Sequence, residues 1–265
     1  MKKVITYMQY LTEYLRHGDF ISIISSVKYL TNKTSHKTNR IVRSSIGTFF
    51  CRRNTNDFQF ANYYYEWGVK KFILNHIKEY TLFIDGGACI GDYSILVSKF
   101  NIKCIAFEPL ADNYTVIQKN LRLNNLVNNV TTFKFGLGKE NKLARFKFNP
   151  VNTGASFIDR ENNSDSLPAE IRTFDSMLAD LKIDTNEKIL FKLDVEGMES
   201  EALQGSVEFI RNYPNITFVM EDKHTGQDSI KAILNKTAVF EFGIVDEFNI
   251  FARKISNFKK NELAC

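Results

Sequence analysis

Short apolar runs alternate with stretches of helical periodicity over most of the chain after Phe49. Runs of five or six residues between turn residues are typical of buried strands. They occupy 81–85, 103–107, 130–135, 189–193 and 216–220. Amphipathic patterns between them predict helices at 92–100, up to about 126, 174–181 and 198–211. Because strands that alternate with helices form parallel sheets, the pattern predicts a doubly wound, mostly parallel α/β fold.

Two further pairs of short runs predict antiparallel hairpins. One pair, 143–148 and 155–158, follows the third predicted strand and has the character of an insertion. The other pair, 239–243 and 248–253, ends the pattern. A mostly parallel sheet accommodates such an antiparallel ending, so the five parallel runs and the last hairpin together predict a seven-stranded sheet.

The N-terminal part has a different pattern. Residues 1–31 carry apolar side chains at helical spacing and predict two short helices around Gly18. Residues 31–45 are polar and rich in hydroxyl groups, which indicates a linker. We therefore divide the chain into a helical extension, residues 1–47, and one α/β domain, residues 48–265.

Composition limits the classes of protein to which the chain can belong. Of its 265 residues, 44% are hydrophobic and 25% charged, as in ordinary globular domains. No apolar run reaches the roughly 18 residues that a membrane-spanning helix needs, and charged residues interrupt the N-terminal apolar stretch, which argues against a signal peptide. The four cysteines are scattered, which predicts reduced thiols in a cytoplasmic protein. They are Cys51, Cys89, Cys104 and Cys265.

Charge is distributed unevenly along the chain. Residues 1–60 contain ten lysines and arginines against three acids, a net charge of +7, and the remainder carries −2. A basic arm on a nearly neutral body indicates an anionic neighbour such as phosphate, a membrane surface or nucleic acid. A solvated helical extension accounts for the same charge equally well.

The first candidate site is the glycine-containing turn after the first predicted strand, within residues 83–94. Asp85, Gly86, Gly87 and Gly91 lie where the strand passes into a helix, so that the backbone can approach a ligand closely. The spacing is not the G-x-G-x-x-G of dinucleotide enzymes, whose pyrophosphate binds at a helix N-terminus. A carboxylate at Asp85 instead suits the ammonium group of S-adenosylmethionine.

The second candidate is Glu108, which ends the second predicted strand a little over twenty residues after Asp85. An acid at this point holds ribose hydroxyls in Rossmann-type sites. A surface glutamate that caps the next helix is the simpler alternative. Together with the glycine turn, Glu108 predicts a site for an adenosine-containing cofactor.

The third candidate lies at the end of the fourth parallel run. Asp194 and Glu196 follow an apolar strand and precede a glycine and a helix, so both could position or deprotonate a hydroxyl group. Capping of that helix would explain part of the pattern. Glu221 and His224 follow the next strand, and the histidine could also serve as a base, although loop histidines are commonly just solvated.

These motifs resemble the FkbM-type methyltransferases over roughly residues 48–253. The most specific resemblance is Phe191-Lys-Leu-Asp-Val-Glu-Gly-Met-Glu199, followed by Leu203 and Gly205. Residues 53–57, Asn120, Asn124 and 172–175 add to it. Two positions depart from the family, since Gly86 stands where a branched apolar residue is usual and Cys89 where asparagine is usual.

The resemblance implies a class I Rossmann-like methyltransferase that transfers a methyl group from S-adenosylmethionine to a hydroxyl oxygen, here of a sugar in a glycan or glycoconjugate. It places Asp85, Gly87 and Gly91 near the methionine, Glu108 at the ribose, and Gly136 and Leu137 near the adenine. The catalytic candidates are Asp194, Glu196 and His224, in that order.

Several alternatives stay open at this point. The acceptor could be a small natural product. A nucleic-acid methyltransferase would explain the basic arm, although the expected Asn/Asp-Pro-Pro-Tyr loop is absent. Mg²⁺ held by Asp194, Glu196 and Glu221 would suit hard oxygen ligands. The arm could also hold the enzyme peripherally at the inner face of a membrane, near a lipid-linked glycan. Arg52 and Arg53 could meet an anionic substrate or pair with surface acids. The aromatic run 63–67 could stack on a sugar, although a helix packed on the core is the simpler interpretation.

Overall fold

The computed structural model describes residues 2–147, 149, 151–159 and 166–258, so Cys265 lies outside the described residues. A seven-stranded sheet forms its centre, in the order β12-β13-β11-β10-β3-β4-β5. The strands, in sheet order, are Val239–Ile244, Asn249–Ser256, Ile216–Glu221, Ile189–Leu193, Leu82–Gly86, Lys103–Phe107 and Val130–Phe133. β13 runs opposite to the other six strands of this sheet. The predicted mostly parallel sheet with a C-terminal antiparallel hairpin is confirmed.

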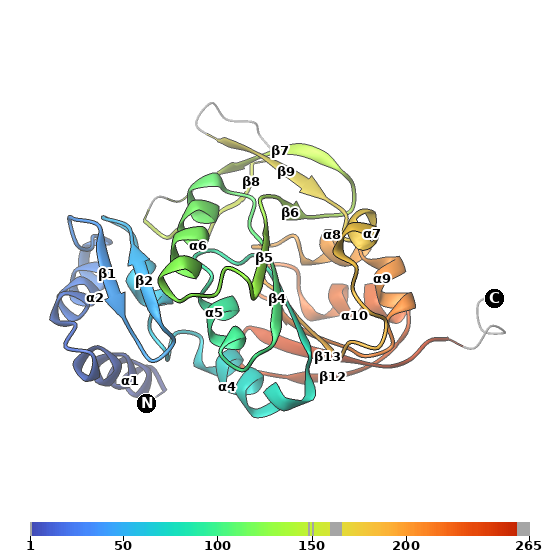
Figure 1. Cartoon of the computed structure of the whole chain (residues 1–265), viewed down its shortest axis with the longest axis horizontal. Coiled ribbons are helices and arrows are strands. Elements are labelled where there is room, and N and C mark those ends of the chain that lie inside the picture. The colour runs from blue at the N-terminus through green and yellow to red at the C-terminus, as the bar shows by residue number, and fades with distance from the viewer. Residues whose placement is uncertain (1, 148, 150, 160–165, 259–265) are drawn as a thin grey trace.

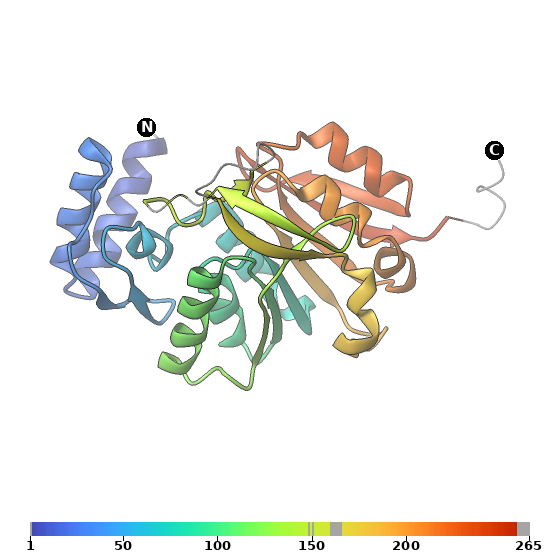
Figure 2. The same cartoon turned by 90° about the horizontal axis from the view of Figure 1, so that it is seen from above.

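Helices cover both faces of this sheet (Figures 1 and 2). α4 (Trp67–His76), α5 (Asp92–Ser98) and α6 (Ala111–Leu123) bury one apolar core, to which Phe83 and Leu190 contribute from the strands. α8 (Glu199–Gln204), α9 (Val207–Asn212) and α10 (Gln227–Asn235) bury a second core on the opposite face, with Ile84 and Phe191. Successive residues of one strand therefore serve different cores, because side chains alternate across a sheet.

The register places the carboxyl ends of the central strands side by side. Gly86 at the end of β3 pairs with Phe107 of β4 and with Leu193 of β10. Leu193 in turn pairs with Met220 of β11. The residues that follow these strands therefore meet at one edge, where ligands bind in open α/β sheets.

A smaller four-stranded sheet, ordered β6-β9-β7-β8, follows β5 in the chain and lies at the top of Figure 1. Its strands in chain order are Gly136–Leu137, Lys142–Lys147, Phe157–Ile158 and Leu167–Arg172. The predicted antiparallel contact between β7 and β8 is confirmed, but most of the pairing of β7 is with β9, over five residues. The sequence pattern predicted neither β9 nor α10.

The N-terminal part contains α1 (Lys2–Arg16) and α2 (Phe20–Asn32), as predicted, and they flank Gly18. The predicted linker at residues 31–45 is wrong in part, because β1 (Arg40–Arg43) pairs antiparallel with β2 (Thr48–Cys51). This hairpin spans residue 47, and the division of the chain there stays a prediction. α3 (Asp57–Phe60) follows β2.

Two other expectations about helices are corrected. The predicted helix 198–211 is two helices that meet at Gly205, where an added Cβ would lie 1.9 Å from the carbonyl oxygen of Gly138. This close approach of two backbones interrupts the helix. A helix was also expected over the aromatic run 63–67, but residues 61–66 form turns, and α4 begins only at Trp67. Short 3-10 turns at Ile77–Glu79 and Asp175–Met177 and the helix α7 (Leu178–Leu181) complete the described elements.

Candidate active site

The glycine turn between β3 and α5 packs directly on the end of β10. Gly87 has a φ of +85°, and a Cβ built there would lie 1.9 Å from the carbonyl oxygen of Asp194. The Asp194 N–H donates to the carbonyl of Gly86 at 3.0 Å. No other residue type fits at Gly87, because a side chain would separate the two strand ends.

Asp85 lies beneath this turn and does not line a cavity. Its Oδ2 accepts a hydrogen bond from Ser94 Oγ at 2.6 Å, and its Oδ1 is buried with no donor among the described residues. Burial raises the pKa of Asp85 to about 6. Since a buried acceptor without a donor is costly, Oδ1 is suited to a ligand that donates or carries positive charge.

Glu108 follows β4 and faces the cavity under the turn. Its carboxylate accepts hydrogen bonds from the N–H groups of Cys89 and Leu110, both at 2.9 Å, and from Asn113 Nδ2 at 3.3 Å. Burial raises the pKa of Glu108 to about 7, against these three donors. The donors fix the orientation of the carboxylate, which a hydroxyl-bearing ligand needs for a defined pose.

The cavity at the carboxyl edge of the sheet brings together residues from four distant parts of the chain. Six of the predicted site residues line it: Gly87, Glu108, Gly136, Leu137, Asp194 and Glu196. Phe146 and Thr153 contribute from β7 and the loop after it. The other predicted residues do not line it: Asp85 and Gly86 are buried, Gly91 precedes α5 in contact with Ile117, and His224 lies in the loop after β11.

A second, polar cavity adjoins the first and shares Gly87, Asp194 and Glu196 with it. Lys192, Glu221 and the aromatic rings of Tyr65 and Tyr93 line the part that the first cavity lacks. The two cavities thus meet at the acids that follow β10.

Three of the eight described non-glycine residues with positive φ line this second cavity. Glu66, Cys89 and Glu196, which all line it, have φ values of 49°, 48° and 51°, in the left-handed region that residues with side chains seldom adopt. Such conformations gather at sites where position matters more than local stability.

A network of buried charges forms one wall of this cavity. Lys192 donates to Asp194 Oδ2 at 2.9 Å, and its ammonium group lies 4.7 Å from the centre of the Tyr93 ring. Lys70 pairs with Asp92 at 3.0 Å. Because Asp194 is already paired with a cation, it is a weaker candidate for a base than its place in the sequence indicated.

Glu66 occupies the same wall and was not predicted. It accepts a hydrogen bond from the Tyr93 hydroxyl at 2.8 Å, and burial, followed by the charge of Asp194, raises its pKa to about 7. Lys192 carried a signal in the sequence, since a lysine in the middle of a fully buried strand needs a charged partner. Glu66 carried none, because the turns that bring it there are set by tertiary contacts.

Glu196, Glu221 and His224 form a group at the open side of the second cavity. His224 Nε2 lies 3.6 Å from Glu196 and 4.0 Å from Glu221. Burial, followed by the charge of Asp194, raises the pKa of Glu196 to about 8 and that of Glu221 to about 7. One donor atom from each of the three lies within 4.8 Å of the others, a set that differs from the predicted metal ligands in having His224 instead of Asp194.

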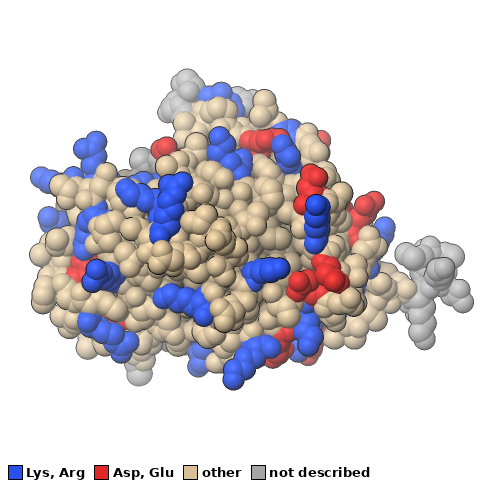
Figure 3. Space-filling view, in the orientation of Figure 1, with Lys and Arg blue, Asp and Glu red and all other residues tan. Residues whose placement is uncertain are grey.

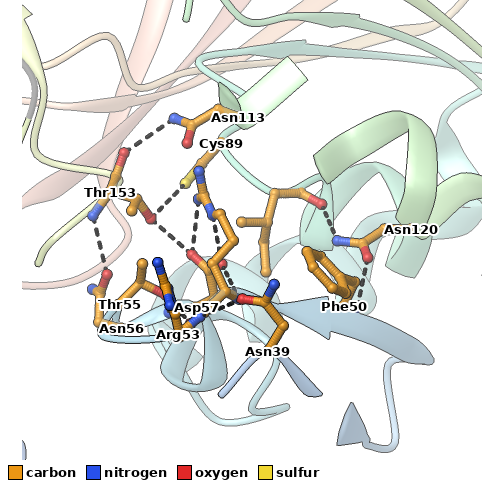
Figure 4. A network of polar contacts seen from close by, with 12 residues as sticks. Asn39, Phe50, Arg53, Thr55, Asn56, Asp57, Cys89, Asn113, Asn120 and Thr153 are labelled. Atoms are coloured by element: carbon orange, nitrogen blue, oxygen red, sulfur yellow. Dashed lines mark hydrogen bonds and ion pairs between the residues drawn. The ribbon is translucent and has the colours of Figure 1, made fainter. Parts of the chain in front are cut away.

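A polar network joins the cofactor loop to the segment after β2 (Figure 4). Arg52 makes two hydrogen bonds to Asp57, at 2.8 and 2.9 Å, and Thr153 donates to the same carboxylate at 2.9 Å. Thr153 also lies 3.9 Å from the Cys89 sulfur. Arg52 is therefore bound internally, and Arg53 is exposed.

The two asparagines in the family-like pattern have structural roles at the same junction. Asn120 accepts a hydrogen bond from Phe50 N–H at 2.7 Å and donates to the Ile90 carbonyl at 2.9 Å. Asn124 pairs in the same way with both backbone groups of Thr48. Side chains from the C-terminal end of α6 and its cap thus make the hydrogen bonds to the β2 backbone that a neighbouring strand would otherwise make.

The model of the methyltransferase FkbM domain matches residues 85–248 of this sequence. A comparison with curated proteins finds no match. Among solved structures, the chain is similar to a methyltransferase FkbM from Methylobacillus flagellatus KT, with 18% identity, a TM-score of 0.48, and coverage of 66% of this chain and 44% of that one. This chain therefore spans less than half the length of that protein.

Two further solved structures are similar at low identity. One is the methyltransferase domain of METTL16, with 11% identity, a TM-score of 0.46, and coverage of 91% of this chain and 80% of that one. The other is a methyltransferase from Geobacter sulfurreducens, with 12% identity, a TM-score of 0.45, and coverage of 72% and 80%.

Proposed function

Because this chain belongs to the FkbM family of methyltransferases, we propose that it transfers a methyl group from S-adenosylmethionine to a hydroxyl oxygen of a sugar in a glycan or glycoconjugate. The observation that carries this proposal is the junction of two cavities at Glu196. One cavity has the residues expected of a cofactor site, and the other has acids and aromatic rings.

The residues of the first cavity fit the cofactor. Glu108 offers a fixed carboxylate to ribose hydroxyls. Asp85 lies outside the cavity lining, beneath the glycine turn, and its buried Oδ1 without a donor gives negative charge below the ammonium end. Gly87 allows the backbone to lie close to the ligand, and Gly136 and Leu137 give an apolar wall for the adenine. When bound, S-adenosylmethionine supplies an electrophilic methyl group on its sulfonium sulfur.

Glu196 is the group that we assign as the proton acceptor. A general base works best when its pKa lies near the operating pH, and the pKa of Glu196 is raised to about 8. In its ionised form it can accept the hydroxyl proton of an acceptor bound in the second cavity. Neighbouring Glu221 and His224 can take the proton onward, since His224 Nε2 lies 3.6 Å from Glu196.

Asp194 and Lys192 serve as positioning residues in this scheme. Their ion pair keeps Asp194 in one orientation between the two cavities, and alignment of the reacting groups supplies much of the acceleration in a displacement reaction. The Tyr65 and Tyr93 rings beside carboxylates suit a sugar, which presents apolar faces and many hydroxyl groups.

Calorimetric titration with S-adenosylmethionine, followed by methyl-transfer assays on a panel of sugars, tests the proposal. We expect micromolar cofactor binding that Glu108→Ala abolishes. Glu196→Gln should retain cofactor binding and lower kcat by 10²-fold or more, the usual contribution of a general base. Glu241→Gln, at an exposed position on β12, is the matched control. Failure of a folded sample to bind S-adenosylmethionine would refute the proposal.

The panel also separates the acceptor classes. Methyl transfer to small hydroxylated natural products but not to sugars would show that the acceptor is a natural product. Salt-dependent retention of the protein on DNA would favour a nucleic-acid substrate. The magnesium site at Asp194, Glu196 and Glu221 stays a prediction, and assays with EDTA and with added Mg²⁺ test it. The cytoplasmic location also stays a prediction, supported by three free cysteines, Cys51, Cys89 and Cys104.

A further inference from the structure

The two N-terminal helices present most of their apolar side chains to the outside of the molecule. On α2, Phe20, Ile24 and Val27 share one face and are 63%, 55% and 59% exposed. The opposite face, which is buried, carries Ser22 and Ser25. This is the reverse of the usual arrangement, in which the apolar stripe of a surface helix faces the core.

α1 shows the same arrangement. Val4, Met8 and Leu15 fall on one face at helical spacing and are exposed, whereas Glu13 and Tyr14 are buried. Further exposed apolar side chains of the two helices are Ile5, Tyr7, Ile21 and Leu30. Exposed apolar surface of this extent on a soluble domain marks an interaction site.

The surroundings of this apolar face are cationic. Arg16, Lys28, Lys33, Lys37, Arg43 and Arg53 are all exposed. The three acids of the segment are buried and have partners: Glu13 accepts from Ser45 N–H at 2.6 Å, Asp19 pairs with Arg40, and Asp57 pairs with Arg52. In Figure 3 the corresponding left-hand end is mostly blue and tan, with little red.

A groove continues this face at the start of α2. Phe20, Ile21 and Ile41 line it together with His17, Arg40 and Arg43. Apolar and cationic groups therefore alternate over a surface that lies apart from both cavities of the candidate active site.

We propose that α1, α2 and this groove bind the surface of an anionic lipid bilayer. An amphipathic helix with basic residues beside its apolar face lies in the plane of the interface and buries that face at the boundary of headgroups and acyl chains. The exposed arginines and lysines then contact lipid phosphates. None of the helices in the described part of the chain has the length and hydrophobicity needed to traverse a bilayer, so this contact is peripheral.

Charge argues for a bilayer over two other occupants. A second copy of the chain would bring two cationic faces together without an exposed acid from these N-terminal segments to pair with them. Nucleic acid would meet the charge but would leave the apolar stripes of both helices in water. An anionic bilayer satisfies both features at once.

Sedimentation of the full chain with vesicles of phosphatidylcholine, with and without 30% phosphatidylglycerol, tests this proposal. We expect binding only to the anionic vesicles, weakened by 0.5 M NaCl because salt screens the cations. Phe20→Ser with Ile24→Ser should abolish binding. Lys28→Glu should weaken it by at least about fivefold, the effect of one cation near such a surface.

Matched control substitutions lie on the far elements of the chain. Leu143→Ser and Ile244→Ser remove apolar side chains that are even more exposed than Phe20 and Ile24, and Lys236→Glu reverses an exposed cation. All three variants should bind as the unaltered chain does. Circular dichroism and the melting temperature establish that each variant is folded.

Three outcomes would overturn the proposal. One is equal binding to neutral and anionic vesicles, and another is no vesicle binding by the folded chain. The third is a dimer in light scattering that Ile24→Ser dissociates, which would assign the face to a second copy. Cofactor titration of the same samples reports on the active site separately, so failure here leaves the proposed methyl transfer unaffected.

Discussion

Replacing Gly87 by alanine probes the contact that holds the cofactor turn to the end of β10. The new Cβ would lie 1.9 Å from the Asp194 carbonyl oxygen and 3.0 Å from its carbon. The backbone must also keep a φ of +85°, which costs a residue with a side chain about 1–2 kcal/mol. Relief of the clash requires the strand ends to move apart, and overpacking of this kind costs roughly 1–3 kcal/mol.

The expected loss in the free energy of unfolding is therefore about 2–5 kcal/mol. Gly18→Ala is the control, because Gly18 has a φ of +66° and nothing within 4 Å of the added Cβ. It should lose only the conformational part, about 1–2 kcal/mol. The difference between the two variants isolates the clash with Asp194.

Urea denaturation measures both losses, and titration with S-adenosylmethionine measures the effect on the site. We expect Gly87→Ala to bind the cofactor at least tenfold more weakly, because a loss of about 1.4 kcal/mol in binding free energy, caused by movement of the glycine turn, corresponds to that factor. Gly18→Ala should bind normally. Equal stabilities and equal affinities for the two variants would refute the reasoning, because the approach of Gly87 to Asp194 would then have no energetic consequence.

Three further substitutions test other contacts. Burial raises the pKa of Glu108 to about 7 in the folded state. Its contribution to the free energy of unfolding is therefore present below the unfolded pKa and is lost as pH rises towards 7, a loss of about 3 kcal/mol. Glu108→Gln should remove this pH dependence from urea titrations. Lys192→Met should lower the free energy of unfolding by about 3–5 kcal/mol, because it leaves buried carboxylates unpaired. The loss should be smaller at pH 5 than at pH 8, and an equal loss at the two pH values would argue against the network of buried charges around Lys192. Asn120→Leu leaves Phe50 N–H and the Ile90 carbonyl without partners, and a melting temperature within 1 °C of the unaltered chain would contradict the expected loss of about 2–4 kcal/mol.

The hydrophobic pattern of the chain was enough to predict the alternation of strands and helices and the residues at the strand ends. The strand at 189–193 and the one at 103–107 agree with the structure at both ends, because each is an apolar run, apart from Lys192 and Lys103, that ends at an acid. Asp194, Glu108 and the glycines of the turn follow from the same logic, since parallel strands bring their carboxyl ends to one edge.

Contacts between segments that are distant in the sequence could not be predicted from local patterns. β9 pairs with β7 about twenty-five residues earlier in the chain, and no periodicity reports which partner a strand will choose. The pairing of Lys192 with Asp194, and the place of Glu66 beside Tyr93, depend on segments that meet only after folding.

The N-terminal helices show most clearly the difference between which residues share a face and which face is buried. Their periodicity determined that Phe20, Ile24 and Val27 share one face, because helix geometry fixes which side chains lie together. That Ser22 and Ser25 face the protein while the apolar face is exposed follows only from how the helix packs on the rest of the chain. The physical reason is that a helical pattern gives the spacing of a face, whereas burial depends on the surfaces that the rest of the chain offers to it.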